Sequence, residues 1–161
     1  MSTASAVVNF WPDDSTAKAF WSQHELPPYQ QLLADTAAWL DPQPDDHWLD
    51  LGCGGGHLTR TLYHKSGGPL AEVVALDCAA KNSRAIEKLN IELQPSFPVR
   101  FIHADFSKGL ALFKDCHFHG VVSGLAIQYA ESYSQELGRW TTEALEHLLR
   151  EVNRILQPGV T

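Results

Sequence analysis

The chain has 161 residues, 44% of them apolar, and a formal charge of −7. This length suits one domain with a buried core and is too short for two comfortable ones. The acidic balance disfavours nucleic acid as a partner, because a nonspecific nucleic-acid binder needs a basic face.

Two features bear on location. No apolar run approaches the roughly eighteen residues of a membrane span, and the opening MSTASAVVNFWPDD lacks the basic start and apolar stretch of a signal peptide. The three cysteines form no CxxC motif and no even framework, a usage typical of free thiols in a reducing compartment. We therefore expect a cytoplasmic protein with no membrane partner.

Residues 1–40 are predicted to form a helical lead, or cap. From Thr16 to Leu40 apolar residues recur at helical intervals. The stretch LPPY (26–29) must interrupt this pattern, because proline cannot continue a helix but can start one. The turn-rich DPQPDD (41–46) marks a boundary, so residues 41–161 are expected to form the second unit.

In that second unit, short apolar runs alternate with helical stretches. The predicted strands are HWLDL (47–51), EVVALD (72–77), PVRFIHAD (98–105) and HGVVSGL (119–125). The predicted helices are 57–65, 79–93 and 141–156. This alternation favours an α/β fold with a doubly wound, mostly parallel sheet and helices on both faces.

Directly after the first predicted strand come four glycines: Gly52, Gly54, Gly55 and Gly56. At the carboxyl end of such a strand, glycine lets a ligand approach main-chain N–H groups without meeting a Cβ. The alternative is an ordinary glycine-rich turn. The dinucleotide pattern G-x-G-x-x-G fails at His57, and no phosphate-loop pattern is present. What remains is D-x-G-x-G-x-G, beginning at Asp50.

The stretch LDLGCGGG (49–56) resembles the first motif of the class I S-adenosylmethionine-dependent methyltransferases. Acidic residues at the ends of the second and third predicted strands, and the L-x-P-G turn in LLREVNRILQPG, are similar to later motifs of this family. The resemblance covers about residues 39–159. It implies a Rossmann-like fold with strand order 3-2-1-4 and S-adenosyl-L-methionine as cofactor.

The resemblance also implies roles for individual residues. Asp77 would hold both ribose hydroxyls, since a carboxylate can accept two hydrogen bonds, and Asp105 would accept from the adenine amino group. Cys78 is a modest departure at a position beside adenine. The implied cofactor-binding set is Asp50, Gly52, Gly54, Gly56, Asp77, Cys78, Asp105, Phe106, Ser123, Gly124 and Leu125. The last three would line the methionine end, and Gln128 and Tyr129 follow as candidate substrate contacts.

Several of these residues also have ordinary structural interpretations. Taken alone, each of the carboxylates of Asp50, Asp77 and Asp105 is as compatible with a strand-terminal turn or a helix N-cap as with ligand binding; together, the three favour ligand binding. Tyr29 has a core role at least as plausible as a cofactor contact. Cys53 is expected to pack rather than act as a nucleophile, because no base stands beside it.

The sequence predicts no metal site. His117 and His119 in HFH have metal-binding side chains, but they are two residues apart and no further ligand cluster accompanies them. We therefore expect solvated or capping histidines.

The predicted function is methyl transfer from S-adenosylmethionine to a small or medium-sized acceptor. Alignment and exclusion of water would do most of the work, and a general base is needed only if the acceptor loses a proton. His24, His57 and Tyr129 are weak candidates for that base. Two alternatives stay open: a non-catalytic S-adenosylmethionine-binding module, and a nicotinamide-dependent Rossmann oxidoreductase, which the failed third glycine disfavours.

The last expectation concerns the end of the chain. LLREVNRILQPGVT stops where the resemblance implies entry into a fifth strand, so we expect a fragment of a longer methyltransferase with little activity of its own. The fourth strand would then lie at a sheet edge. Exposed edges invite pairing with another chain, and self-association is expected.

Overall fold

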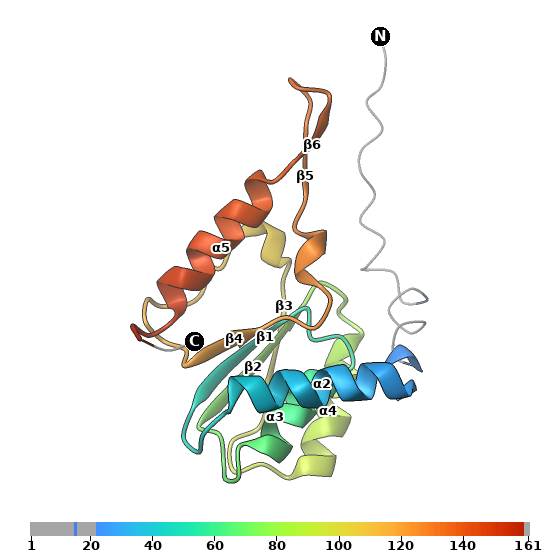
Figure 1. Cartoon of the computed structure of the whole chain (residues 1–161), viewed down its shortest axis with the longest axis vertical. Coiled ribbons are helices and arrows are strands. Elements are labelled where there is room, and N and C mark those ends of the chain that lie inside the picture. Colours follow the sequence, from blue (N-terminus) through green and yellow to red (C-terminus); the bar gives the residue numbers. More distant parts are fainter. Residues whose placement is uncertain (1–14, 16–21, 160–161) are drawn as a thin grey trace.

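The computed structural model describes residue 15 and residues 22–159. Within these residues, the centre of the molecule is a four-stranded parallel sheet with the order β3-β2-β1-β4 (Figure 1). Its strands are β1 (His47–Leu51), β2 (Glu72–Asp77), β3 (Arg100–His103) and β4 (Gly120–Val122). The predicted α/β fold and its 3-2-1-4 strand order are confirmed.

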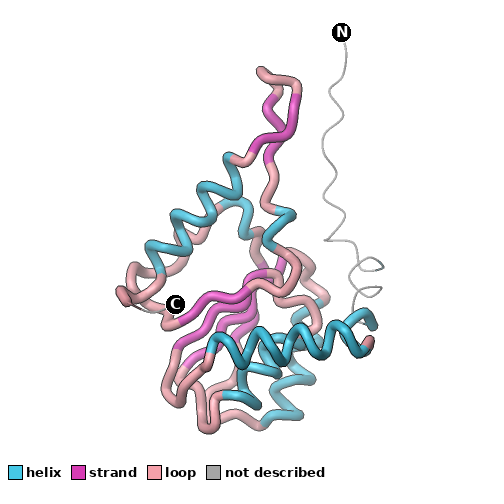
Figure 2. Tube along the Cα trace, in the orientation of Figure 1, coloured by secondary structure: helices cyan, strands magenta, loops and turns pink. Residues whose placement is uncertain are grey.

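Helices cover both faces of the sheet, as the alternation predicted. Figure 2 shows α2 (Pro27–Leu40), α3 (His57–Lys65) and α4 (Asn82–Leu93) on one side and α5 (Glu143–Ile155) on the other. The central strands β1 and β2 therefore bury both of their faces, which is why they are mainly apolar rather than alternating. In β2, for example, Val73 packs toward α3 and α4, while Val74 packs toward α5.

The N-terminal elements agree with the sequence in outline. The interruption at the two prolines is confirmed: α2 begins at Pro27, and the 3-10 helix η1 (Ser22–Glu25) precedes it. The first part of the predicted helix, residues 16–21, lies outside the described residues. Leu33 and Ala37 of α2 belong to the same core cluster as α3 and α4. A division between residues 1–40 and 41–161 remains a prediction.

Some boundaries differ from the prediction. The helix expected over 79–93 begins at Asn82, because the residues after β2 form a turn in which Asn82 N–H donates to the carbonyl of Ala79. At both ends, β3 and β4 are shorter than the strands expected over residues 98–105 and 119–125. Beyond them lie two short 3-10 helices, η2 (Phe106–Lys108) and η3 (Ile127–Tyr129).

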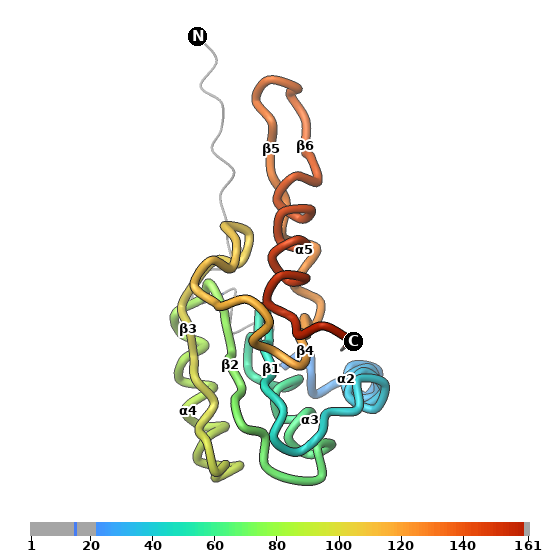
Figure 3. The backbone as a smooth tube through the Cα atoms, turned by 90° about the vertical axis from the view of Figure 1, so that its left-hand side faces the viewer, coloured from blue at the N-terminus to red at the C-terminus, as the bar shows by residue number. Residues whose placement is uncertain are grey.

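The sequence analysis did not predict the hairpin that follows η3. An antiparallel hairpin of β5 (Ser132–Ser134) and β6 (Arg139–Thr141) follows η3. Figure 3 shows it projecting beyond one end of α5, away from the parallel sheet. Its strands are too short to show an alternating pattern in the sequence.

Among the described residues, none of the helices has the length and apolar character to cross a membrane.

Candidate functional site

A cavity of about 350 Å³ lies at the carboxyl ends of the parallel strands, where doubly wound sheets bind their ligands. Its walls come from the loops after β1, β2, β3 and β4, with η1 and α2 contributing from the N-terminal side. Most of the residues expected at the site line it: Gly52, Gly54, Asp77, Cys78, Asp105, Phe106, Gly124, Leu125, Gln128 and Tyr129.

The glycines after β1 serve different purposes. Gly52, Gly54 and Gly56 all have positive φ, at 72°, 50° and 78°, a region that other residues adopt only with strain. A Cβ on Gly54 would meet no atom within 4 Å, so this glycine faces open space in the cavity wall. A Cβ on Gly52 would collide with the side chain of Ala126 in the loop after β4. The loop therefore combines a cradle for a ligand with a tight contact between two loops.

Asp77 joins two of the cavity's loops. Its carboxylate accepts hydrogen bonds from Gly54 N–H at 2.9 Å and Ala79 N–H at 2.8 Å. The side chain is mostly buried but still lines the cavity. Asp77 thus has the turn role that the sequence left open, and its position at the cavity is compatible with the ribose role as well.

Asp105 shows the same double character. It is the N-cap of η2, where Oδ1 accepts from Ser107 N–H at 3.0 Å and from the Ser107 hydroxyl at 2.6 Å. Its neighbour Phe106 lies beside it in the cavity lining. One carboxylate oxygen has capping partners, which is the geometry that helix N-caps favour.

Three residues of the expected set do not line this cavity. Asp50 is buried below the glycine loop, where its carboxylate accepts from the Thr59 hydroxyl at 2.7 Å. Burial raises the pKa of Asp50 to about 7 despite that hydrogen bond. Gly56 caps the start of α3, and the Ser123 hydroxyl donates to the carbonyl of Leu51 at 2.9 Å. A direct role of these three in cofactor binding stays a prediction.

A second, smaller pocket of about 120 Å³ adjoins the cavity. It lies between α2, α3 and the loop after β4, and its lining includes Ser123. It shares four residues with the larger cavity: His24, Tyr29, Gly124 and Leu125. Leucines supply much of the remaining wall: Leu32, Leu33 and Leu58.

The structure also brings in residues that the sequence did not single out as site residues. They include Gln23, Gly55, Ala79, Asn82, Ser107 and Ala126. Ala79 and Ser107 stand one or two residues from expected positions, so proximity in the chain could have suggested them. Gln23 and Asn82 carried no such signal. Tyr29, for which core and contact roles were open, lines both pockets.

The three candidates for a general base differ in position. His24 and Tyr129 line the cavity, whereas His57 begins α3 outside its lining. His57 stacks on His24, with ring centroids 4.6 Å apart and planes at 11°. Burial, and next the neighbouring His24, lowers the pKa of His57 to about 4. His57 is therefore neutral and weakly basic near pH 7.

Two sequence interpretations away from the cavity can be checked directly. Cys53 packs in the core below α3, and burial raises the pKa of its thiol, so the packing role is confirmed. His117 is partly exposed, but it also has a partner that the sequence did not suggest: its Nε2 lies 2.5 Å from Oε2 of Glu72. His119 does cap a strand start, since its Nδ1 accepts from His47 N–H at 3.0 Å.

Comparison with known proteins agrees with this geometry. Residues 49–161 match the family model described as "Methyltransferase domain". The chain is also similar to a protein described as a methyltransferase in its complex with the activator Trm112 from Haloferax volcanii. That structure is 23% identical with a TM-score of 0.66, over 98% of this chain and 59% of the other.

Two further similarities extend the comparison. A protein from Methanococcus maripaludis, described as an S-adenosyl-L-methionine-dependent methyltransferase, is 16% identical with a TM-score of 0.66, over 99% of this chain and 65% of the other. Over 33 residues the chain is 54% identical to the 23S rRNA (uracil(1939)-C(5))-methyltransferase RlmD of Yersinia enterocolitica, covering 20% of this chain and 7% of the enzyme.

The two structural similarities are low in identity and show the fold alone, and this chain spans less than two thirds of each of the three proteins. The family match is broader, because it runs from Leu49, the third residue of β1, to the last residue of the chain. The chain belongs to the methyltransferase-domain family, whose methyl donor is S-adenosylmethionine.

Proposed function

We propose that this chain binds S-adenosyl-L-methionine in the cavity at the carboxyl ends of the strands and, as part of a methyltransferase, presents its methyl group to a small or medium-sized acceptor. The observation that carries the proposal is the open space at Gly54. A backbone with positive φ and no side chain faces a cavity of about 350 Å³ there, within the range of small-molecule sites.

The adenosine end of the cofactor is assigned to the loops after β2 and β3. Asp77 offers a carboxylate at the cavity wall and Asp105 offers another. Phe106, which follows Asp105 in the chain and also lines the cavity, offers an apolar ring for adenine. Each carboxylate oxygen can accept more than one hydrogen bond, so the loop contacts of Asp77 leave acceptor capacity for the ribose hydroxyls.

The methionine end and the acceptor are assigned to the other side of the cavity. Ser123, Gly124 and Leu125 line the smaller pocket that adjoins it. Gln128 and Tyr129 line the larger cavity close to this loop in sequence. The sulfonium supplies the reactive methyl group, so the chain's contribution is alignment and exclusion of water. If the acceptor must lose a proton, His24 and Tyr129 are better placed than His57.

Two readings compete with this one. A nicotinamide-dependent oxidoreductase would need the G-x-G-x-x-G turn, and position 57 is histidine rather than glycine. A non-catalytic module would bind the cofactor without turnover. Calorimetry with NAD distinguishes the oxidoreductase hypothesis from ours. A methyl-transfer assay distinguishes the hypothesis of a non-catalytic module from ours. We further propose a cytoplasmic location and a small-molecule acceptor, with nucleic acid disfavoured by the charge of −7.

The test is a pair of glycine variants titrated with S-adenosylhomocysteine. Gly54→Val should abolish binding, because a branched side chain would fill the open space in the cavity wall. Gly67→Val is the matched control: Gly67 also has positive φ (67°) and open space around its Cβ, but it lies between α3 and β2, outside the cavity lining. Both variants should lose a similar stability of about 1–2 kcal/mol from the left-handed backbone.

The expected result is heat on titration of the wild type and of Gly67→Val with S-adenosylhomocysteine, and none with NAD. Normal binding by a folded Gly54→Val variant would mean that the glycine loop is an ordinary turn. Heat with NAD and none with S-adenosylhomocysteine would favour the oxidoreductase reading.

A further inference from the structure

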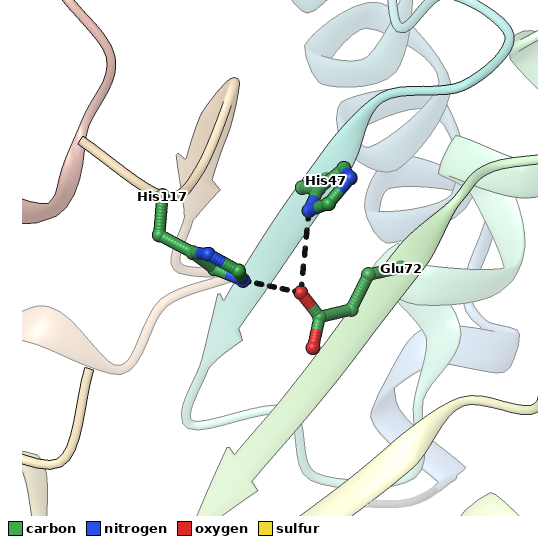
Figure 4. A group of neighbouring side chains, drawn as sticks. All are labelled: His47, Glu72 and His117. Atoms are coloured by element: carbon green, nitrogen blue, oxygen red, sulfur yellow. Dashed lines mark hydrogen bonds and ion pairs between the residues drawn. The ribbon is translucent and has the colours of Figure 1, made fainter. Parts of the chain in front are cut away.

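Three metal-binding side chains converge at the end of the sheet opposite the cavity (Figure 4). His47 is the first residue of β1, Glu72 is the first residue of β2, and His117 lies shortly before β4. One imidazole nitrogen of each histidine and one carboxylate oxygen lie within 4.8 Å of one another. All three side chains are partly buried.

We propose that His47, Glu72 and His117 form a binding site for one zinc-like divalent transition-metal ion. Two histidines and one carboxylate, with a water molecule as fourth ligand, are a ligand set that Zn²⁺ takes in tetrahedral sites. Imidazole and carboxylate together favour first-row transition metals over Mg²⁺ and Ca²⁺, which prefer oxygen ligands alone.

Two of the three distances between ligand atoms can be compared with those that such an ion requires. Ligand bonds of about 2.0–2.2 Å in a tetrahedron place the ligand atoms roughly 3.3–3.6 Å apart. His47 Nδ1 already lies 3.3 Å from Glu72 Oε2. His117 Nε2 lies 2.5 Å from the same oxygen, so this pair must open by roughly 0.8–1.1 Å to admit the ion.

Neighbouring residues orient the three proposed ligands. His47 Nδ1 is enclosed by protein and forms no hydrogen bond, although it faces the carboxylate of Glu72. Arg100 holds the other oxygen of Glu72, Oε1, at 2.9 Å and leaves Oε2 turned toward the histidines. Hydrogen-bonded partners of this kind orient the ligating carboxylate in metal sites.

The place of the cluster indicates what a bound ion would do. It would join the starts of β1 and β2 to the segment before β4. That segment also meets the end of α5, since His117 N–H and Phe118 N–H both donate to the carbonyl of Ile155. The cavity lies at the other end of the strands. The ion would therefore brace the sheet rather than take part in methyl transfer.

The test is zinc binding by the full chain after removal of metals with a chelator. Titration calorimetry with ZnCl₂ should give one equivalent bound per chain, and Zn²⁺ should raise the thermal unfolding midpoint. His117→Ala should weaken zinc binding by more than the roughly 10- to 100-fold that loss of an outer partner costs. His64→Ala is the control, because His64 is an exposed histidine in the last turn of α3.

Glu72→Gln provides a second variant, which keeps the size of the side chain and should fold even if His117→Ala does not. It should weaken zinc binding to a similar extent, because the neutral amide is a poor ligand. Failure of the wild type to bind zinc would overturn the proposal. So would equal zinc affinity in the wild type and Glu72→Gln, or a loss in His64→Ala as large as in the cluster variants. In those cases the cluster is an ion-paired brace without metal.

Discussion

Two carboxylates, Asp77 and Asp105, both hydrogen-bond to loop residues and line the cavity. Asp77 holds the amides of Gly54 and Ala79 while it lines the cavity, and Asp105 caps η2 from a similar position. The sequence presented the turn and ligand roles of these carboxylates as alternatives. In the fold they are compatible, because a carboxylate has about four sites that accept hydrogen bonds. A carboxylate fixed by its own loops is also preorganised for a ligand.

Asp50 leads to a prediction about pH. Its carboxyl is buried, and its pKa is raised from 3.8 to about 7, chiefly by that burial. The folded state therefore holds this proton more tightly than the unfolded state does. The stability that this group contributes is complete below about pH 4 and is lost as the pH rises to about 7. The loss is at most about 4 kcal/mol for a shift of this size.

Asp50→Asn should remove this dependence, because the amide carries no charge and its oxygen can still accept from the Thr59 hydroxyl. The measurement is the free energy of unfolding in urea at several values between about pH 4 and 8. The difference between wild type and variant should shift in favour of the variant as the pH rises. Asp35→Asn, at an exposed site on α2, should leave the curve unchanged. A constant difference between wild type and Asp50→Asn would show that Asp50 is ionised throughout.

At the scale of elements, the sequence located β1, β2 and α3 to the residue. Turn residues mark their limits, such as the glycines between β1 and α3 and the Ser-Gly-Gly-Pro stretch between α3 and β2. Less regular stretches were missed or shortened, as in β3, β4 and the hairpin of β5 and β6. Strands of three or four residues hold too few positions for an apolar pattern to emerge, so neighbouring strands decide where they begin and end.

The pairing of β1 with β4 depends on one glycine. Trp48 is paired with Gly120 in register, and its buried ring lies where a Cβ of Gly120 would be. Gly120→Ala should therefore force the indole or the strand to move, at a cost of about 1–3 kcal/mol for overpacking. Gly124→Ala is the control, since a Cβ there would make ordinary contact with Leu58 at 3.5 Å and its φ is not positive.

Urea unfolding of the two variants checks this prediction. We expect a clear loss of stability in Gly120→Ala and little change in Gly124→Ala. Equal stability of the two variants would mean that Trp48 has room to rotate and that the contact does not constrain the strand.

At the scale of the whole molecule, the edge of the sheet at β4 bears on association with other molecules. Within the described residues β4 is an edge strand, paired with β1 on one side. On its other side the chain after α5 only begins to pair, through a single parallel bridge between Phe118 and Leu156. Unpaired main-chain groups of an edge invite a strand from another molecule.

We therefore predict that the chain self-associates. Sedimentation velocity over a wide range of protein concentrations should show species larger than a monomer that grow with concentration. A single monomeric species at every concentration would contradict the prediction and would mean that the edge is protected by its own side chains.

The sequence by itself determined the alternation of strands and helices, the glycine loop and the family resemblance, because each depends on residues that are close together in the chain. Tertiary structure decided the rest. Gln23 reaches the cavity only because η1 folds over the strand ends. His117 meets Glu72 and His47 because parallel strands bring their starting ends together at one end of the sheet: His47 and Glu72 begin β1 and β2, and His117 lies three residues before β4. Along the chain, 45 positions separate His117 from Glu72 and 70 separate it from His47. No local pattern encodes such a meeting, since it depends on strand order and register.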